Sequence, residues 1–567
     1  MAEAQQTQKD VAPAATRPQA WITAVVFSDG TRIELARHEI LVLVGPNNAG
    51  KSVALRDLLN KMQMPSHDSL VVVMVEFEIE GDGLKWEESL PRKPSQPDPN
   101  YVDLPFGRQH RNNIVHAWTQ ARHAGLGMLT PLFAILLSTE GRLQAANQVA
   151  NINFVTEPMT APLHHVHEND ELEIRLSNIV HQAFGHDLIV NRGAGSQIML
   201  HLGSRPIAPG GDRQAATYRQ AVNSLPFVQA QGDGIRAFVG ILLHTLVLDH
   251  DVILIDEPDA FLHPPQAALM GRVLAVETPN PRQLIVATHS TDFLRGVLDA
   301  PESPVRVVRV RRKGDQNHVR QLDPESVRNV WRDPLLRYSN VLDGLFHDGV
   351  IVCEADGDCR FYNAMMDVVT SEDARPDLLL THCGGKHRVA TVIQSLRAID
   401  VPVRAVLDFD ALSEESTLQK IYESFGGNWD EIRPDWRLVT TAIESRRPEL
   451  PTSKVKEKLD GILTSVTRGS VPEAAIKQIR DVLRGASAWS EAKRMGKAFI
   501  PSGEPTAAYI HLADKLRSLG LYLVEVGSLS NSASPSATTG RSGWSRCLSA
   551  TLRLTWSSNP LGNSAGR

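Results

Sequence analysis

An eight-residue loop near the N-terminus has the residue types and the spacing that hold nucleotide phosphates. It reads GPNNAGKS and matches G-x-x-x-x-G-K-[ST]. In such a loop the glycines let successive backbone N–H groups converge on phosphate oxygens, the lysine reaches the β- and γ-phosphates, and the serine hydroxyl ligates Mg²⁺. The residues predicted to bind ATP and Mg²⁺ here are Gly45, Pro46, Asn47, Asn48, Ala49, Gly50, Lys51 and Ser52.

Two later stretches supply the groups that would act on a bound nucleotide. DVILIDEPDAFLHP ends an apolar run with Asp256 and Glu257, and QLIVATHSTDFL ends another with His289. We expect Asp256 to hold Mg²⁺ through water and Glu257 to orient or deprotonate the attacking water. A histidine just beyond the end of a central strand can contact a γ-phosphate. Each group alone has a structural interpretation, but their order along the chain favours nucleotide chemistry.

A second set of carboxylates begins near residue 350. Glu354 follows one apolar run, and Asp408 and Asp410 follow another. Carboxylates at the ends of parallel strands share the crevice of an α/β sheet, and residues two apart point the same way. An oxygen-only set of this kind suits Mg²⁺ or Mn²⁺. Each acid alone would fit a solvated turn.

The elements that must position these groups are short buried strands, each followed by a helical pattern. ILVLV (40–44) is entirely apolar, and the short runs before Asp256, Glu354 and Asp408 are mostly apolar. Such runs are typical of parallel strands covered on both faces. The chain of 567 residues is too long for one ordinary domain. We therefore predict an α/β protein with two successive domains.

The amino-acid composition restricts the binding partners and the cellular location expected for the protein. The chain is 42% hydrophobic and 22% charged, with a net charge of -6, so nucleic acid would need a local basic patch. None of the four cysteines lies in a C-x-x-C pair, which argues against a disulfide framework or a zinc knuckle. The N-terminus lacks a signal-peptide core, and no apolar run has the length of a membrane span. We expect a cytoplasmic protein that does not engage a membrane.

The order of the nucleotide motifs resembles the ATP-binding-cassette class of ATPases, in its soluble branch of chromosome-maintenance and repair proteins. DEPDAFLHP is similar to the D-E-P-x-x-x-L-H-P of that branch. The resemblance implies that two heads dimerise face to face, each completing the other's site with a signature loop. The candidate loop is Gly232, Asp233 and Gly234, which stand where serine-any-glycine is usual. The missing serine hydroxyl puts the rate of ATP hydrolysis in question rather than nucleotide binding.

The second acid set resembles the TOPRIM domain of topoisomerases, primases and certain nucleases. CEADGDCRFY is similar to E-G-x-x-D with alanine in place of glycine, and LDFD supplies the D-x-D. The resemblance implies that Asp358 is a further metal ligand. HCGGKHRV looks like the small-residue turn of nuclease members, in which Lys386 would touch a phosphate. A cassette ATPase followed by this domain looks like the OLD family (overcoming lysogenisation defect). The resemblance implies an ATP-controlled, metal-dependent DNA endonuclease associated with defence against phage, in which two divalent ions stabilise the attacking water and the leaving oxygen. It also leaves room for a defence partner protein, and an RNA substrate stays open.

The predicted organisation has four parts. Residues 1–20 are a disordered N-terminus, 21–335 an ABC-type ATPase head with a mixed insert at about 75–220, and 340–527 a Rossmann-like TOPRIM domain with a helical insert at about 411–505. Around the start of the first insert, SLVVVMVEFEIEGDGLKWEE (69–88) alternates like the strands of an added sheet, and residues 112–150 are predicted to be helices. Residues 528–567 are a disordered tail rich in serine and threonine, without Asp, Glu or Lys. Nuclease members usually continue as G-E-L-E where this chain reads GSLS, so we hypothesise a reading-frame change near residue 528. Sequencing the source locus would test it.

Three interpretations stay open. The departure at residue 528 favours an alternative function, a nucleotide-switched sensor or scaffold with an inactive TOPRIM domain that signals to a partner. The histidine-rich LHHVHEND (163–170) is interpreted as a solvated loop rather than a metal cluster, because it lacks a second ligand group at a recognisable spacing. RVVRVRRKG (306–314) fits either a basic patch for nucleic acid or an ordinary half-exposed strand.

Overall fold

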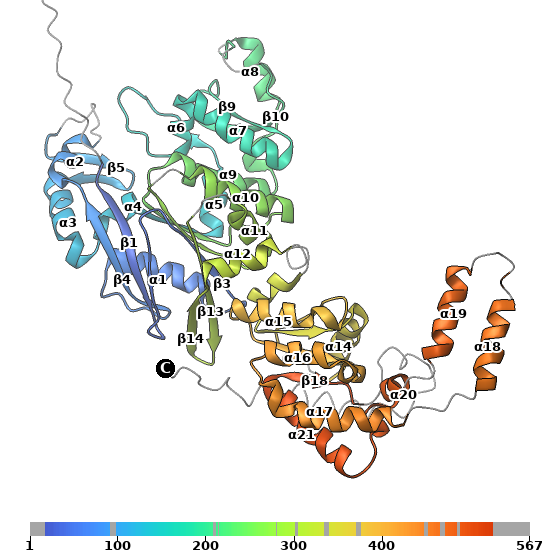
Figure 1. The fold of residues 1–567 in the computed structure, drawn as a ribbon. Helices are drawn as coiled ribbons and strands as arrows, with labels where there is room; N and C mark the ends of the chain where they lie inside the picture. Colours follow the sequence, from blue (N-terminus) through green and yellow to red (C-terminus); the bar gives the residue numbers. More distant parts are fainter. Residues whose placement is uncertain are drawn as a thin grey trace, which may run out of the picture. The chain divides into compact units, whose positions relative to one another are not determined.

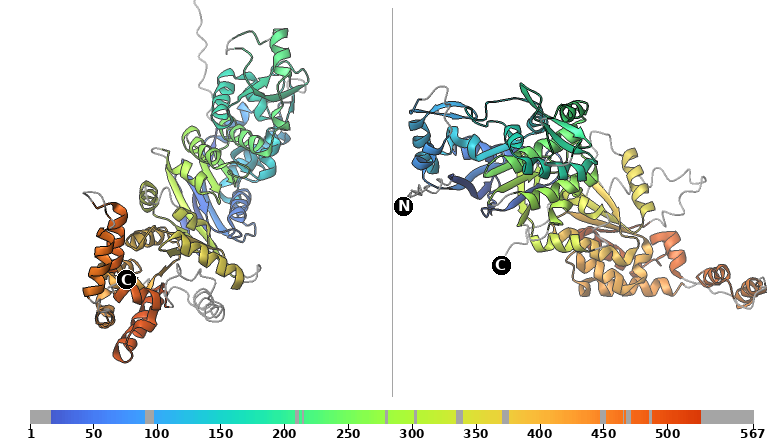
Figure 2. Two further views of the ribbon diagram at one scale, coloured as in Figure 1. Left: turned by 90° about the vertical axis from the view of Figure 1, so that its right-hand side faces the viewer. Right: turned by 90° about the horizontal axis from the view of Figure 1, so that it is seen from above.

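The computed structural model describes residues 17–90, 98–207, 211–213, 215–278, 281–300, 304–333, 340–369, 376–446, 452–464, 466, 471–484 and 488–525. The chain divides into two compact units, Met1–Arg332 and Asp333–Arg567 (Figures 1 and 2), and each is described by itself. The predicted tail 528–567 and residues 1–16 of the predicted N-terminal segment lie outside the described residues. No helix in the described part of the chain combines the length and the apolar character needed to cross a bilayer.

A six-stranded sheet of order β14-β13-β3-β12-β11-β7 forms the centre of the first unit. Five strands are parallel, and β14 closes the edge as the antiparallel partner of β13. Every residue of β3 and of β12 is buried, as expected for apolar strands covered on both faces. The strands are β3 (Ile40–Val44), β7 (Ala134–Leu137), β11 (Val252–Asp256), β12 (Gln283–Ala287), β13 (Val305–Lys313) and β14 (Gln316–Gln321).

Helices follow the strands that carry the nucleotide motifs. α1 (Lys51–Gln63) begins directly after the phosphate loop, α10 (Pro264–Glu277) follows β11, and α11 (Thr291–Leu298) follows β12. α10 and α11 lie side by side (Figure 1), and α12 (Pro324–Arg332) ends the unit. Because the strands are parallel, their carboxyl ends and the starts of these helices meet at one edge of the sheet.

An antiparallel sheet of order β2-β1-β4 packs near α1. Its strands are β1 (Gln19–Phe27), β2 (Arg32–Glu34) and β4 (Val72–Glu80). β4 confirms the strand predicted within residues 69–88 in part, because residues 83–88 are helical instead. β1 begins two residues inside the segment predicted to be disordered. The elements that follow are α2 (Gly83–Ser89), β5 (Tyr101–Leu104), β6 (Gly107–His110), α3 (Arg111–Ala124), η1 (Gly127–Leu129) and α4 (Thr130–Phe133).

The prediction that residues 112–150 are helices is wrong in part. β7 lies within this stretch and pairs in parallel with β11 at the edge of the central sheet. Its sequence AILL continues the apolar residues Leu132 and Phe133, and periodicity alone does not separate strand from helix in so short an apolar run. α5 (Thr139–Ala145) follows β7 directly, and β8 (Val149–Ala150) comes next.

The segment between β8 and β11 is mixed. Three strands form a sheet of order β8-β10-β9, with α7 packed against β9. The solvated loop predicted at LHHVHEND is also wrong, because α6 covers these residues and His164 is buried there, with its Nε2 3.0 Å from the Ala150 carbonyl oxygen. The elements are α6 (Pro162–Glu168), α7 (Asp170–Phe184), β9 (Asp187–Asn191), β10 (Gln197–Gly203), α8 (Ala216–Asn223), η2 (Val228–Ala230), α9 (Asp233–Leu242) and η3 (Leu243–Val247).

The second unit is built on a four-stranded parallel sheet of order β16-β15-β17-β18. β15 (Gly349–Cys353) is buried throughout, and its carboxyl end adjoins those of β16 (Leu378–His382) and β17 (Val403–Leu407). The helices between these strands are α14 (Asp356–Val369) and α15 (Val389–Ala398), with short turns η4 (Asn340–Phe346), η6 (Lys386–Arg388) and η7 (Phe409–Ser413).

A run of helices separates β17 from the last strand, β18 (Leu521–Leu523). α17 packs along α21, and the buried face of α17 includes Ile432, Trp436 and Val439. The helices are α16 (Glu415–Ser424), α17 (Trp429–Glu444), α18 (Thr452–Thr464), α19 (Glu473–Arg484), α20 (Ala488–Met495), η8 (Gly496–Phe499) and α21 (Glu504–Leu519). α20 also contacts η7, which brings it to the residues that follow β17.

Candidate functional sites

The phosphate loop is held by the β13–β14 hairpin. Gly45 and Gly50 have φ angles of 146° and 96°, in the region that side chains disfavour. A Cβ atom at Gly45 would lie 2.0 Å from the Val310 carbonyl oxygen, so only glycine fits against β13. The Nδ2 of Asn317 on β14 donates to the Ala49 carbonyl oxygen at 3.1 Å. The loop conformation therefore depends on strands that come more than 250 residues later in the chain.

Lys51 and Ser52 occupy the first turn of α1. The Lys51 Nζ donates to the carbonyl oxygens of Gly45 and Pro46 at 2.7 and 2.8 Å, and its side chain is buried. Burial lowers the pKa of Lys51, against the opposing charges of Glu257 and Asp256. The Ser52 Oγ donates to Asp256 Oδ1 at 2.9 Å, which places the two predicted Mg²⁺ ligands side by side. Their oxygen donors fit the chemistry of Mg²⁺.

The two predicted catalytic groups of the nucleotide site lie together. The Nδ1 of His289 is 3.4 Å from Glu257 Oε1. Glu257 adopts a left-handed backbone conformation with φ 49°, and its N–H donates to the Ala287 carbonyl oxygen at 2.8 Å. Burial raises the pKa of Asp256, against the hydrogen bond from Ser52. The proximity follows from the strand order, because β12 lies between β3 and β11.

Asp259 and Arg142 also belong to this site and were missed from the sequence. Asp259 is buried, its Oδ1 accepts from the Thr288 Oγ1 at 2.6 Å, and its Oδ2 lies 3.7 Å from His289 Nε2. Its place two residues after Glu257 was the available signal. Arg142 is fully buried on α5 and donates to the Asp256 carbonyl oxygen. No local pattern marks it, because the strand before it was predicted as helix.

The candidate signature loop lies at the start of α9. Gly232 is the N-cap, and Asp233 and Gly234 form the first turn, with Asp233 Oδ1 3.0 Å from Arg236 Nη1. A Cβ atom at Gly234 would lie 2.6 Å from the Phe261 carbonyl oxygen, so the loop after β11 packs directly on this turn. Phe261 has φ 68° and is exposed. The structure thus brings Gly232–Gly234 against the segment that follows Asp256 and Glu257.

In the second unit the predicted acids gather at the carboxyl ends of β15 and β17. The Asp408 N–H donates to Glu354 Oε1 at 2.9 Å, and the Ala355 N–H donates to Asp358 Oδ2 at 3.0 Å. Burial raises the pKa of Glu354 to about 7, and the charges of Asp408 and Asp410 add to the shift. The pKa of Asp358 is raised by burial and by Asp408. Mutual repulsion of this kind is typical of carboxylates that share a site.

A lysine that the sequence analysis missed lies between these acids. The Nζ of Lys493 on α20 is 2.7 Å from Asp408 Oδ2 and 3.1 Å from Asp410 Oδ1. Burial alone would lower the pKa of Lys493, but the hydrogen bond and charges of the two aspartates outweigh it and raise the pKa. Lys493 lies in the helical insert, remote in sequence from both acids, and no motif marks it. The predicted phosphate contact, Lys386, is instead paired with Glu414 at 2.9 Å.

The donor set of the second unit fits a divalent cation by its chemistry, because Glu354, Asp408 and Asp410 offer only carboxylate oxygens. Within the described residues, however, no group of three or more His, Cys, Asp or Glu side chains is arranged to hold a metal ion. The Lys493 ammonium takes the position between the two aspartates. A metal would therefore have to displace this ammonium.

The predicted basic stretch 306–314 forms β13 and part of the turn after it. Five of the nine residues of β13 (Val305–Lys313) are buried, including Arg309, so β13 is an inner strand rather than a half-exposed one. Arg306 pairs with Glu39 at 2.9 Å. The basic side chains that remain exposed are those of Arg312 and Lys313 at the end of the strand.

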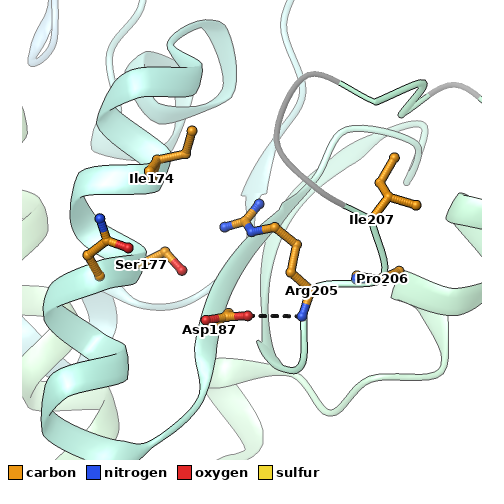
Figure 3. A pocket seen from close by; sticks show the side chains of 7 residues that line it. Ile174, Ser177, Asp187, Arg205, Pro206 and Ile207 are labelled. Carbon is orange, nitrogen blue, oxygen red and sulfur yellow. Dashed lines mark hydrogen bonds between the residues drawn. The ribbon is translucent and has the colours of Figure 1, made fainter.

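A pocket of about 350 Å³ lies apart from both sites, between α7 and the segment after β10 (Figure 3). Asp187 Oδ2 accepts from the Arg205 N–H at 3.0 Å, and the Arg205 guanidinium donates to Glu173 at 2.8 Å and to the Leu188 carbonyl oxygen at 3.0 Å. Arg205 thereby ties the segment after β10 to α7 and β9. These bonds give the arginine a structural role, and we assign no ligand to the pocket.

Comparison with known proteins agrees with the nucleotide site. A family model described as "AAA domain, putative AbiEii toxin, Type IV TA system" matches residues 181–295, entirely within the first unit. The matched span contains Gly232–Gly234, Asp256, Glu257 and His289. The first unit therefore contains an ATPase-type α/β domain with a phosphate loop, in keeping with ATP binding. No curated protein sequence matches the chain.

Several solved structures of Smc head domains are similar to part of the chain. A head bound to the C-winged helix domain of ScpA is 14% identical, with a TM-score of 0.32, over 54% of this chain and 99% of that one. The Pyrococcus furiosus head with an extended coiled coil is 11% identical, with a TM-score of 0.32, over 56% and 99%. The Thermotoga maritima head is 11% identical, with a TM-score of 0.28, over 54% and 100%. At these values we draw nothing further from the likeness.

Proposed function

We propose that this chain is an ATP-binding, metal-dependent DNA endonuclease whose cutting domain is controlled by an ABC-type ATPase head. The observation that carries the nuclease part is the convergence of Asp408 and Asp410 on one cation, the Lys493 ammonium, beside Glu354. Carboxylates at the ends of parallel strands could hold the divalent ions that stabilise the attacking and leaving oxygens of a phosphodiester, once such ions replace the ammonium. An ATPase-type domain precedes them in the same chain.

At the nucleotide site each residue would have a defined task. Lys51 would turn its ammonium from the loop carbonyls to the β- and γ-phosphates, and Ser52 and Asp256 would hold Mg²⁺. The ion would supply neutralisation of the phosphate charge. Glu257 would orient or deprotonate the attacking water, and His289 would contact the γ-phosphate from the end of β12. The 3.4 Å separation of His289 and Glu257 supports a shared task.

At the acid site Glu354, Asp358, Asp408 and Asp410 would hold Mg²⁺ or Mn²⁺, which would stabilise both the attacking and the leaving oxygen of the phosphodiester. Glu354, with a pKa of about 7, would give up its proton as the positive charge arrives. Lys493 would leave the aspartates at the same time. Its ammonium would then be free to contact a phosphate oxygen.

The proposed assembly is a homodimer or higher oligomer through the heads, in which Gly232–Gly234 of one copy meets the nucleotide of the other. Support comes from the resemblance of the motif order to cassette ATPases and from the exposure of Gly232 and Asp233 at the start of α9, where a second copy could reach them. We propose a role in defence against phage or in DNA processing, in the cytoplasm, with room for a defence partner protein.

A second candidate is a nucleotide-switched sensor or scaffold with an inactive second domain. The specific observation in its favour is that Lys493 already pairs with both Asp408 and Asp410. An intramolecular cation of this kind would keep metal out unless another event moved α20. In this case the second unit would signal to a partner instead of cutting.

Cleavage of a supercoiled plasmid separates the two candidates. The full chain is incubated with Mg²⁺ or Mn²⁺, with and without ATP, beside Asp408→Ala, Lys51→Ala and the control Asp460→Ala, whose carboxylate is exposed on α18. We expect the wild type and Asp460→Ala to nick the plasmid, Asp408→Ala to be inactive, and Lys51→Ala to lose the effect of ATP. If no metal supports cleavage while ATP still binds, the sensor is the better description.

A further inference from the structure

We propose that Arg142 is a positioning residue that sets the geometry of Glu257 and links it to the candidate signature helix α9. The inference rests on the proposed hydrolysis of ATP at Glu257 and names a residue that regulates that site. Arg142 lies on α5, directly after the edge strand β7, and so reaches the end of the neighbouring strand β11.

Arg142 is a buried charged residue whose guanidinium contacts the peptide bond between Asp256 and Glu257. Its side chain has 0% exposure. Nη1 donates to the Asp256 carbonyl oxygen, and Nη2 donates to the Thr139 Oγ1 at 3.3 Å. Burial lowers the pKa of Arg142, while the charges of Asp259, Asp256 and Glu257 act against this shift. A buried guanidinium is costly unless it is compensated, and here three acids of the nucleotide site provide the compensation.

The peptide bond between Asp256 and Glu257 is fixed from both sides. Its carbonyl oxygen accepts from Arg142, and its N–H donates to the Ala287 carbonyl oxygen of β12 at 2.8 Å. The residue that follows this peptide bond, Glu257, has φ 49°. A non-glycine residue in this left-handed region is strained, so it persists only where its surroundings hold it. Arg142 is one of the two groups that hold this peptide.

The same helix is packed against α9. A Cβ atom at Gly240 of α9 would lie 1.9 Å from the Arg142 carbonyl oxygen, so the two backbones are in direct contact. Arg236 on α9 donates from Nη2 to the Leu143 carbonyl oxygen at 3.4 Å. A shift of α9 when its N-terminal loop meets a second copy's nucleotide would move α5, and with it Arg142. The orientation of the Glu257 carboxylate would then depend on contact between the heads.

The chain offers a matched control in Arg282. Its side chain is 11% exposed, burial lowers its pKa as it does for Arg142, and it also donates to a backbone carbonyl, that of Thr245, at 2.7 Å. Arg282 directly precedes β12, so it lies at the amino ends of the parallel strands, whereas Glu257 lies at their carboxyl ends. Arg282→Met therefore removes a comparable buried charge without touching the nucleotide acids.

The test compares Arg142→Met, Arg142→Lys and Arg282→Met in the full chain. ATP turnover and the binding of a fluorescent ATP analogue are measured together. We expect Arg142→Met to lower kcat by about 10²-fold, the loss typical of a misplaced catalytic group, while the analogue binds within about threefold of wild type. Arg142→Lys should restore part of kcat, and Arg282→Met should leave kcat within about twofold even if it lowers the melting temperature.

A second measurement does not depend on turnover. Amide hydrogen exchange of the peptide that contains Glu257 should quicken in Arg142→Met and stay unchanged in Arg282→Met, because only the first loses a bond to that peptide unit. If exchange and kcat of Arg142→Met match those of Arg282→Met, Arg142 is merely structural and the proposal is overturned. If the wild type binds but does not hydrolyse ATP, the proposed ATPase activity fails, and the exchange experiment still decides the role of Arg142.

Discussion

At the scale of single residues, the burial of Glu354 in the acid site, together with the nearby charges, makes the stability of the second unit depend on pH. Glu354 has a pKa of about 7, above its ordinary value of 4.5. The folded state therefore binds an extra proton between these values, and the associated stability is complete below pH 4.5 and lost as pH rises through 7. We predict that Glu354→Gln abolishes metal-dependent cleavage yet is stabilised relative to wild type at pH 8, by up to about 3 kcal/mol.

Urea unfolding in EDTA at pH 5 and pH 8 measures this difference. Glu423→Gln serves as the control because the Glu423 side chain is exposed at the end of α16. A Glu354→Gln variant whose stability depends on pH as the wild type's does would show that the carboxylate ionises without penalty.

Removal of the Lys493 side chain is expected to favour metal binding at the acid site, whereas Glu354→Gln removes a candidate metal ligand. Without its ammonium, Asp408 and Asp410 repel each other and attract a divalent ion more strongly. We expect Lys493→Met to lower the melting temperature in EDTA and to bind Mn²⁺ about tenfold more tightly, a change of about 1.4 kcal/mol. Titration of the melting temperature with Mn²⁺ gives both quantities. Lys497→Met is the control, since Lys497 pairs with Glu525 and leaves the aspartates untouched.

At the scale of elements, the β13–β14 hairpin supports the phosphate loop through Asn317. The Asn317 Nδ2 bonds the Ala49 carbonyl oxygen, and this side chain is buried. We predict that Asn317→Ala weakens ATP binding about tenfold and costs about 1 kcal/mol of stability, the contribution of one buried hydrogen bond. Equilibrium titration with a fluorescent ATP analogue tests it against Asn147→Ala, which alters the turn after α5. Unchanged affinity in Asn317→Ala would mean that the loop holds its shape without the hairpin.

At the scale of the whole molecule, the two units should respond to pH in opposite directions. Burial lowers the pKa of both His244 and His250 in the first unit from 6.5 to about 4. The unfolded state therefore takes up protons first as pH falls below 6.5, and the first unit loses stability down to pH 4 by about 3 kcal/mol per histidine. Glu354 in the second unit has the reverse sign.

Calorimetry between pH 4.5 and pH 8 should therefore show the melting transition of the first unit fall as the solution is acidified. His244→Leu should flatten this dependence, whereas His116→Leu, at an exposed position on α3, should not. Equal slopes for the two variants would assign the acid sensitivity of the first unit to other groups.

Local sequence was enough for the parts of this protein that depend on neighbouring residues. The apolar runs before Lys51, Glu257 and His289 predicted parallel strands, and they are β3, β11 and β12. The glycines around the phosphate loop predicted its sharp turn, because a backbone with positive φ needs them. The acids after β15 and β17 could be expected to share one edge, since parallel strands end on the same side of a sheet.

Only the tertiary structure decided which distant side chains contact the residues of the two sites. The run AILL carries no periodicity that separates strand from helix, so only pairing with β11 made it β7 and brought Arg142 to the Asp256 carbonyl. Lys493 reaches Asp408 because a helix of the insert folds back on the end of β17, a contact that no spacing encodes. Glycine spacing marks where the backbone can turn sharply, whereas the partner of a buried charge depends on how distant segments pack.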